Sequence, residues 1–171
     1  MEFRLLTAGE IDVRVGHVSE KGCSLLLYKD ARVDMTILDE TVGTEGWQRK
    51  HYECKGNMYC SVGVLCGETW VWKDDCGAES NTEKEKGEAS DSFKRACVNW
   101  GIGRELYTAP FIWIPAEKVS VVKNEKSGRY QTFEKFYVEK IACGEQNHIT
   151  GIAIRNGRGE RVFVWKAEKT A

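Results

Sequence analysis

The stretch WQRKHYECKGNMYCSVGVLCGETWVWKDD, residues 47–75, decides the fold of this chain. Apolar and polar side chains alternate through three short runs, and the turns Gly56-Asn57 and Gly67-Glu68 separate the runs. A period of two is typical of a strand with one buried face, and turns this short join antiparallel neighbours. The pattern therefore predicts a three-stranded antiparallel meander.

Two tryptophans, Trp70 and Trp72, share one face of the third run. Buried aromatic rings supply much of the packing of a small domain, so we expect both rings to anchor the core. If they are exposed instead, stacking on nucleic-acid bases is the alternative.

The segment TEKEKGEASDSFKRACVNWGIG, residues 82–103, follows the meander and predicts a long helix. Thr82 and Glu85 form a capping box at its start, and Gly101 suits the left-handed position just past its end. Its apolar residues recur three and four apart and form one buried stripe of Ala89, Phe93, Ala96, Cys97 and Trp100. We expect this stripe to cover the inner face of the meander, which gives an α+β fold with a β-β-β-α core.

Lys94 and Arg95 are adjacent cations in this helix. At about 100° per residue, Arg95 points almost directly away from the buried stripe and Lys94 lies on its flank. Both cations are therefore expected to face solvent or a ligand. The simpler alternative is a surface ion pair between Asp91 and Arg95, four residues apart, which would contribute about 0.3–0.5 kcal/mol.

The segment before the meander predicts three further elements. Thr7 and Glu10 form a capping-box pattern that favours a short helix before Gly16, although the apolar residues after Glu10 also alternate as they would in a strand. Residues 23–28 are a short apolar run and predict a strand. Residues 30–40 carry apolar side chains at helical spacing and predict a helix packed on that strand.

The chain after Pro110 contains three further strand-like runs. We expect one domain, residues 1–171, with a core at about 6–115 and a β-rich C-terminal extension at about 116–166. The extension would pack on the same sheet or on a neighbouring subunit. The turn signals between its runs are Ser127-Gly128, Gly144-Glu145 and Asn156-Gly157.

Composition limits the function classes. The chain has 171 residues, of which 42% are hydrophobic and 30% are charged, a balance that suits one soluble core. No apolar run approaches the roughly 20 residues that cross a membrane, and the first residues lack the pattern of a signal peptide, so we expect a cytoplasmic protein without membrane contact. The net charge of −1 does not by itself indicate nucleic-acid binding, but residues 116–171 hold 11 Lys and Arg against 7 Asp and Glu.

The seven cysteines predict free thiols rather than a disulfide scaffold, because their number is odd and the expected compartment is reducing. Cys54, Cys60, Cys66 and Cys76 lack the tight two-residue spacing of zinc knuckles. Cys60 and Cys66 share the parity of Val62, which predicts that they lie on the buried face of a strand. We expect no metal and no cofactor.

The string SDSFKRACVNWG, residues 90–101, resembles the signature helix of the Rad-fifty-two/Rad-twenty-two family of single-strand annealing proteins. A second string, YKDARVDMTILDETVGTEGW at residues 28–47, is similar to the family's extended segment, helix-opening arginine and Gly-x-x-Gly-Trp turn, with Arg32, Gly43 and Gly46 at the matching places. The resemblance covers about residues 6–107 and is greatest to the compact phage and prophage members often called Sak-like.

The resemblance implies a non-enzymatic protein that binds single-stranded DNA and anneals strands in homologous recombination and double-strand break repair. It implies a homo-oligomeric ring or helical arc, a single-strand-binding protein as a further partner, and the cytoplasm of a bacterial host. By resemblance Arg32, Lys94 and Arg95 line a groove for the sugar-phosphate backbone, and Lys86 is a weaker candidate. The cations suggested by position alone are Arg49, Lys50 and Arg104.

This sequence departs from the family at Thr44, where an aromatic residue is common, and at Val98, where a further cation is common. Two other function classes stay open. One is a structural or partner-binding module of the same fold without DNA activity. The other is a metal-dependent nuclease that would use a carboxylate cluster of Asp74, Asp75 and Glu79.

Overall fold

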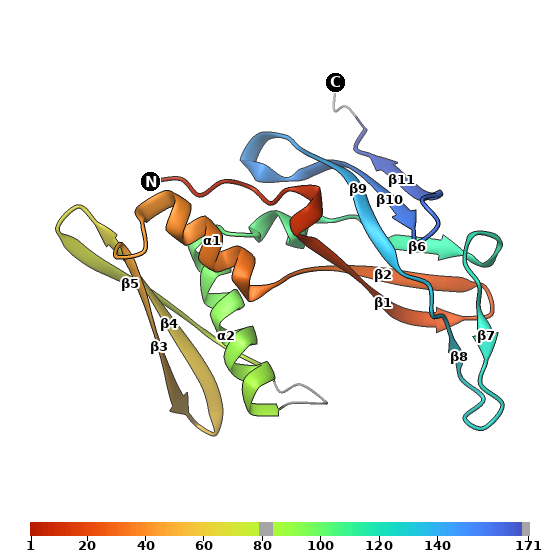
Figure 1. Ribbon diagram of the computed structural model, residues 1–171, viewed down its shortest axis with the longest axis horizontal. Helices are drawn as coiled ribbons and strands as arrows, with labels where there is room; N and C mark the ends of the chain where they lie inside the picture. Colours follow the sequence, from red (N-terminus) through yellow and green to blue (C-terminus); the bar gives the residue numbers. More distant parts are fainter. Residues whose placement is uncertain (79–83, 169–171) are drawn as a thin grey trace. The chain divides into compact units, whose positions relative to one another are not determined.

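The computed structural model describes residues 1–78 and 84–168, which form an α+β fold with mostly antiparallel sheets (Figure 1). The described part of the chain contains two α-helices and eleven strands. The chain divides into two compact units. Unit 1 comprises residues 1–6 and 29–104, and unit 2 comprises residues 7–28 and 105–171. Each unit is therefore discontinuous in sequence.

Unit 1 contains a three-stranded antiparallel sheet of β3 (Trp47–Cys54), β4 (Asn57–Cys66) and β5 (Thr69–Cys76), in that order. Lys55 and Gly56 join β3 to β4 with φ values of 54° and 77°. Two successive residues with positive φ make the tight hairpin turn whose twist matches that of the paired strands.

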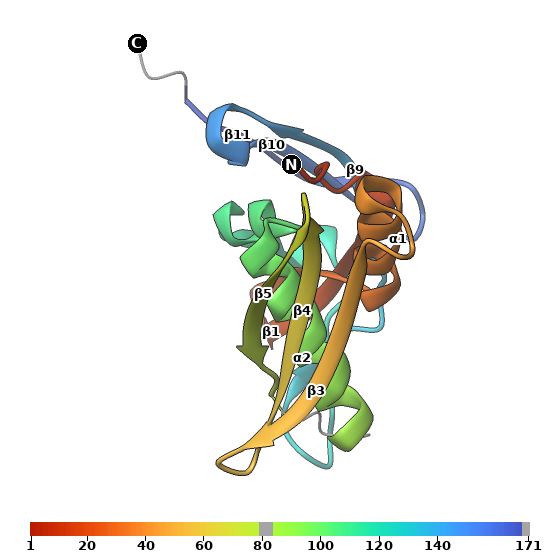
Figure 2. The same ribbon diagram turned by 90° about the vertical axis from the view of Figure 1, so that its left-hand side faces the viewer.

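Helix α2 (Lys84–Trp100) packs on one face of this sheet, and Figure 2 shows the three strands in front of it. The fully buried side chains at this contact are Phe93, Ala96 and Cys97 from α2, and Cys60, Val62 and Val64 from β4. Cys60 therefore lies on the buried face of its strand, as its parity predicted. The capping box predicted at the start of the helix lies outside the described residues.

Helix α2 ends at Gly101, which has a φ of 103°. The N–H of Ile102 donates to the carbonyl of Cys97 at 3.1 Å, and the N–H of Gly101 donates to that of Val98 at 2.9 Å. This pair of bonds is the Schellman motif, which satisfies carbonyls of the last helical turn and needs a residue with positive φ.

Helix α1 (Ala31–Val42) begins after Asp30, whose carboxylate accepts a hydrogen bond from the Arg32 N–H at 2.8 Å. An aspartate in this position satisfies one of the unpaired amides of the first turn. After the helix, the indole N–H of Trp47 donates to Asp39 at 2.6 Å, and the Trp47 ring stacks on Phe93 with centroids 5.9 Å apart.

The two tryptophans of β5 lie on the outer face of the sheet. Trp72 is paired with Gly63 and Trp70 with Leu65, whereas Val71 is paired with the buried Val64. Since directly paired residues share a face, the tryptophans point away from α2. The expectation that they anchor the core is wrong, because the register of the hairpin assigns them to the opposite side.

Unit 2 is built around a six-stranded sheet of order β11-β10-β9-β1-β2-β6. Its strands are β1 (Ile11–Ser19), β2 (Gly22–Lys29), β6 (Ile112–Pro115), β9 (Phe136–Cys143), β10 (Ile149–Asn156) and β11 (Arg161–Lys166). A separate hairpin pairs β7 (Val122–Lys123) with β8 (Tyr130–Gln131). Lys29, the last residue of β2, belongs to unit 1.

The capping box predicted at Thr7 and Glu10 is confirmed, but the helix that it opens does not continue toward Gly16. A 3-10 helix covers only Ala8–Glu10, and its Thr7 N–H donates to the Glu10 carboxylate at 2.8 Å. The residues that follow form β1, which pairs with β9 through Asp12 and Tyr137. Its other neighbour in the sheet is β2, which follows after a two-residue turn, so a local hairpin and a distant strand together override the helical pattern.

The chain after Pro110 forms six strands rather than three. Four of them, β6 and β9 to β11, join β1 and β2 in one sheet. They therefore do not join the sheet of the meander, which was one of the two arrangements expected. All seven cysteines are free thiols. In the described part of the chain, no helix is long and apolar enough to cross a membrane.

Candidate nucleic-acid interface

A buried ion pair joins the two helices of unit 1. The Lys29 ammonium donates to the Asp34 carboxylate in the first turn of α1, and also to the backbone carbonyl of Lys94 in α2 at 3.2 Å. Lys29 is 6% exposed and Asp34 is fully buried. We call this place, with Arg32 beside it, the α1–α2 junction.

Burial controls the electrostatics of the junction. It raises the pKa of the Asp34 carboxyl to about 6, while the positive charges of Lys29 and Lys94 oppose the rise. A buried carboxylate is costly to desolvate, and a nearby ammonium compensates for much of that cost. The pair therefore fixes Lys29 against the α2 backbone.

Two predicted site residues, Arg32 and Lys94, lie on the two helices that meet at this junction. The Arg32 side chain, in the first turn of α1, is 89% exposed and its guanidinium lies 3.8 Å from the Asp30 carboxylate. The Lys94 side chain is 20% exposed and its ammonium lies 3.9 Å from Asp91. Both have weak, partly solvated ion pairs, which leave cations available to an anionic ligand.

Arg95 lies on the other flank of α2. Its guanidinium is 3.3 Å from the Asp75 carboxylate of β5, and its side chain is 47% exposed. One turn later Asn99 donates to the Asp74 carbonyl at 2.9 Å, which ties the same flank to β5. The two adjacent cations of the signature string therefore point to different sides of the helix, as their 100° separation requires.

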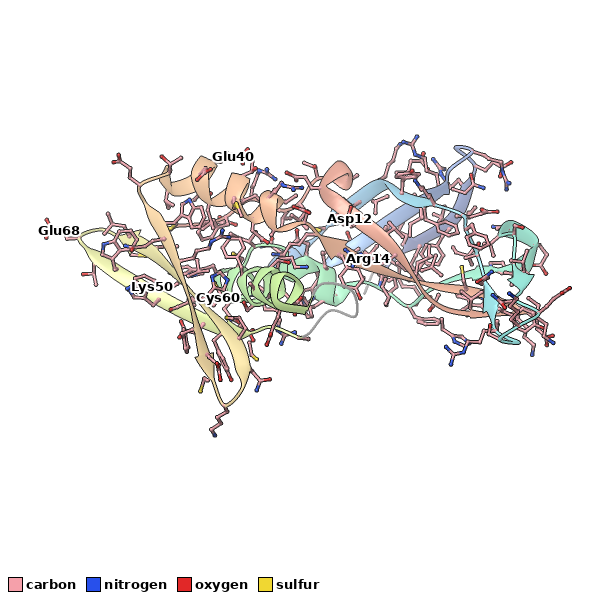
Figure 3. All side chains as sticks on the ribbon, turned by 60° about the horizontal axis from the view of Figure 1, so that its bottom comes forward. Asp12, Arg14, Glu40, Lys50, Cys60 and Glu68 are labelled. Carbon is pink, nitrogen blue, oxygen red and sulfur yellow. The ribbon has the colours of Figure 1, made fainter. Side chains whose placement is uncertain are left out.

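Arg49 and Lys50 lie on opposite faces of β3. The exposed Arg49 reaches the inner face, where its guanidinium is 4.8 Å from the centre of the Phe93 ring. Burial raises the pKa of the Cys60 thiol to about 11, and the charge of Arg49 opposes this rise. Lys50 and Cys60 project from opposite sides of the sheet in Figure 3, so Lys50 is separate from the junction.

Arg104 completes the C-terminus of α2. Its guanidinium donates to the carbonyl of Val98 at 2.9 and 3.1 Å and to that of Asn99 at 2.9 Å. Cations favour helix C-termini because the last carbonyls are unpaired and partly negative. This arrangement gives Arg104 a structural role. Lys86 lies in α2, and its side chain is outside the described residues.

Sequence reasoning missed two lysines of unit 1. Lys29 was not predicted because it ends an apolar strand, although Asp34, five residues later, was a possible ion-pair partner in the sequence. Lys73 was also missed: its ammonium donates to the Asn99 carbonyl at 2.9 Å and lies 4.4 Å from the centre of the Trp100 ring. The signal available in the sequence was the register of the β4–β5 hairpin, which pairs Lys73 directly with the buried Val62 and so places both on the inner face.

The carboxylates proposed for a nuclease do not form a pair. Asp74 accepts hydrogen bonds from the Tyr52 and Ser61 hydroxyls on the outer face, whereas Asp75 faces Arg95. Adjacent strand residues point to opposite faces, which explains the separation. Glu79 is outside the described residues. Within residues 1–78 and 84–168, no group of three or more His, Cys, Asp or Glu side chains could hold a metal ion.

The geometry thus separates the six predicted cations whose side chains the structure describes. Arg32 lies exposed in the first turn of α1, Lys94 lies beside the α1–α2 junction, and Arg49 lies on the inner face of the sheet beside α2. Arg95 faces β5, Arg104 caps α2 and Lys50 lies on the outer face of the sheet. No protein-family model, curated protein or solved structure matches the chain.

Proposed function

We propose that this chain binds single-stranded DNA without sequence preference and anneals complementary strands in homologous recombination and double-strand break repair, as the Rad-fifty-two family does. One observation carries the proposal. Arg32 and Lys94 come from two strings of residues far apart in sequence, and Lys29 joins the two helices that carry them by bonding to Asp34 of α1 and to the Lys94 carbonyl of α2. Both strings are those that carry the resemblance to the family.

Annealing needs no covalent chemistry. It needs a surface that holds a strand by its phosphates and leaves the bases able to pair, and contacts to phosphates carry no sequence information. Arginine can grip a phosphate through two donors of its planar fork, while lysine acts as a point charge. The bonds of Lys29 to Asp34 and to the Lys94 carbonyl would keep together the helices α1 and α2 that carry these cations when a strand arrives.

The proposal extends to fold and assembly. The sheet β3-β4-β5 with helix α2 would correspond to the family's β-β-β-α core, and unit 2 would supply its β-rich extension. One subunit offers cations for only a few phosphates, so useful affinity requires a ring or helical arc of subunits. A single-strand-binding protein would deliver the strands.

The experiment is a fluorescence-quenching annealing assay, with strand affinity measured over a series of salt concentrations. The test variant is Arg32→Ala with Lys94→Ala. The control is Lys126→Ala with Arg129→Ala, which removes the same charge from exposed positions of the β7–β8 hairpin. Each lost phosphate contact lowers the slope of log affinity against log salt by about 0.7 for a single strand.

We expect the test variant to lose about 1.4 from this slope and to anneal slowly, while the control behaves as the unmodified protein does. Equal slopes in the two variants would remove Arg32 and Lys94 from the site. If the unmodified protein forms oligomers but neither binds nor anneals strands, it is a structural module. Shortened strands on a gel would indicate a nuclease.

A further inference from the structure

The outer face of the meander carries four aromatic rings in two pairs, and Figure 2 views the sheet from this side. We call Tyr52, Tyr59, Trp70 and Trp72 the aromatic face. The Tyr52 and Tyr59 rings are stacked with centroids 5.5 Å apart and planes at 21°, and the Trp70 and Trp72 rings are 6.2 Å apart. Tyr52 is 41% exposed and the other three rings are half-buried.

Trp72 lies flat against the sheet. A Cβ built on Gly63, its pairing partner, would come within 2.9 Å of three atoms of the six-membered indole ring at nearly equal distances. Equal distances to three ring atoms mean that the ring plane, rather than its edge, meets the backbone. Glycine is the residue that leaves room for this contact, so the indole turns its other side outward.

Side chains around the rings hold them in place. The Tyr52 hydroxyl donates to the Asp74 carboxylate at 2.9 Å, and the Ser61 hydroxyl donates to the same carboxylate. The Lys50 ammonium lies 4.6 Å from the centre of the Trp72 ring. The face therefore combines rings of restricted orientation with the exposed cation of Lys50. The carboxylate of Asp74 on this face already accepts hydrogen bonds from two hydroxyls.

This chemistry fits one kind of occupant best. Planar rings held flat on a sheet stack with planar bases of any sequence, and a neighbouring cation attracts the phosphates that connect them. Tyrosine and tryptophan are also enriched at protein interfaces, so a second copy of the chain is the competing occupant, although Leu65 is the one branched aliphatic residue on the outward face of the three strands. We propose that the aromatic face binds unpaired bases of a single-stranded nucleic acid by stacking, with Lys50 beside the backbone.

The proposed site is distinct from the α1–α2 junction, because it lies on the face of the sheet that points away from α2. The two sites would recognise different parts of a strand. The junction would hold phosphates, whereas the aromatic face would hold bases. A probe with a backbone but no bases separates the two.

The test compares the affinities of the protein for oligothymidylate and for an abasic strand of the same length. The variants are Trp72→Leu and Tyr52→Leu, and Trp72→Phe retains a ring at the same position. Phe133→Leu is the matched control, since Phe133 is a 78% exposed aromatic residue of unit 2. Thermal unfolding verifies that each variant is folded, and Tyr52, being exposed, can be replaced even if Trp72 cannot.

We expect Trp72→Leu and Tyr52→Leu each to weaken oligothymidylate binding about tenfold and to leave abasic-strand binding unchanged. Trp72→Phe should recover most of the loss, and Phe133→Leu should have no effect. The double variant of Arg32 and Lys94 should weaken the binding of both strands equally. The proposed phosphate contacts and the proposed stacking site can therefore fail separately.

Equal affinities of the unmodified protein for the two strands would overturn the stacking site. So would variants that leave oligothymidylate affinity unchanged. If Trp72→Leu instead lowers the mass of an oligomer in sedimentation without changing strand affinity, the aromatic face contacts a second copy of the chain, which also overturns the proposal.

Discussion

The ammonium of Lys29 donates to the carboxylate of Asp34 inside unit 1, where both side chains are buried. Lys29 ends one strand and Asp34 lies in the first turn of the next helix, so the pair closes a short segment of chain. The second bond of Lys29, to the Lys94 carbonyl, adds α2 to the same contact.

Replacing one partner of the pair should be more harmful than replacing both. Asp34→Ala leaves an unpaired ammonium in a buried site, and we expect it to lower the free energy of unfolding by about 3–5 kcal/mol. Lys29→Met combined with Asp34→Leu should recover most of that loss. Urea unfolding followed by circular dichroism measures both, and a double variant less stable than the single one would contradict the explanation.

Gly103 lies against the same lysine. It has a φ of 70°, and a Cβ at this position would come within 2.6 Å of the Lys29 Cδ and Cε atoms. We expect Gly103→Ala to lower the midpoint of thermal unfolding, because both the backbone conformation and the contact disfavour a side chain. Gly56→Ala is the matched control, since it has a similar φ of 77° and open space around it. Equal losses in the two variants would show that only the backbone conformation matters.

Arg104 should contribute to stability rather than to strand binding. Arg104→Ala removes charged donors from the Val98 and Asn99 carbonyls, which keep the Gly101 N–H and the Lys73 ammonium as donors, and we expect a loss of about 1–2 kcal/mol in the free energy of unfolding. Its effect on the salt dependence of strand affinity should be negligible. A salt slope reduced by about 0.7 would return Arg104 to the list of phosphate contacts.

Tyr52 should ionise at unusually high pH. Its hydrogen bond to Asp74 raises the pKa of the phenol to about 12, since the neighbouring carboxylate disfavours a second negative charge. The folded pKa lies above the ordinary value of about 10, so the stability from this bond is complete below about pH 10 and is lost as pH rises through 12.

Carbon-13 NMR of labelled tyrosine follows this ionisation directly. In Asp74→Asn the pKa of Tyr52 should fall toward 10, because the negative charge is removed and the remaining amide oxygen is a weaker acceptor. An unchanged pKa in that variant would mean that another group controls the phenol. Tyr107, which is 70% exposed, provides the reference signal.

Local sequence determined the elements whose ends are fixed by neighbouring residues. Asp30 caps α1, Gly101 ends α2 at positive φ, and the alternation from Trp47 onward marks the strands of the meander. Capping bonds and turns involve residues within four or five positions of one another, so their chemistry can be read directly from the chain.

The face of Trp70 and Trp72 was also within reach of the sequence. A two-residue turn after Cys66 pairs Trp72 with Gly63, which has the opposite parity to the valines of β4. The prediction failed because aromatic residues were assumed to be buried, and register was not applied. Hairpin register is a local property, and it overrides the tendency of a residue type toward the core.

Other features were decided only by tertiary structure. The position of β1 between β2 and β9 joins segments that are far apart in the chain. The partners of Lys94 and Arg95, on separate sides of α2, come from the neighbouring β2 and β5. The burial of Lys29 likewise depends on a carbonyl of Lys94, 65 positions away. The sequence alone determined helices, turns and alternating strands because these depend on near neighbours. Only the folded chain decided strand order, the two units and the partners of each cation, because those contacts join residues whose separation leaves no local pattern.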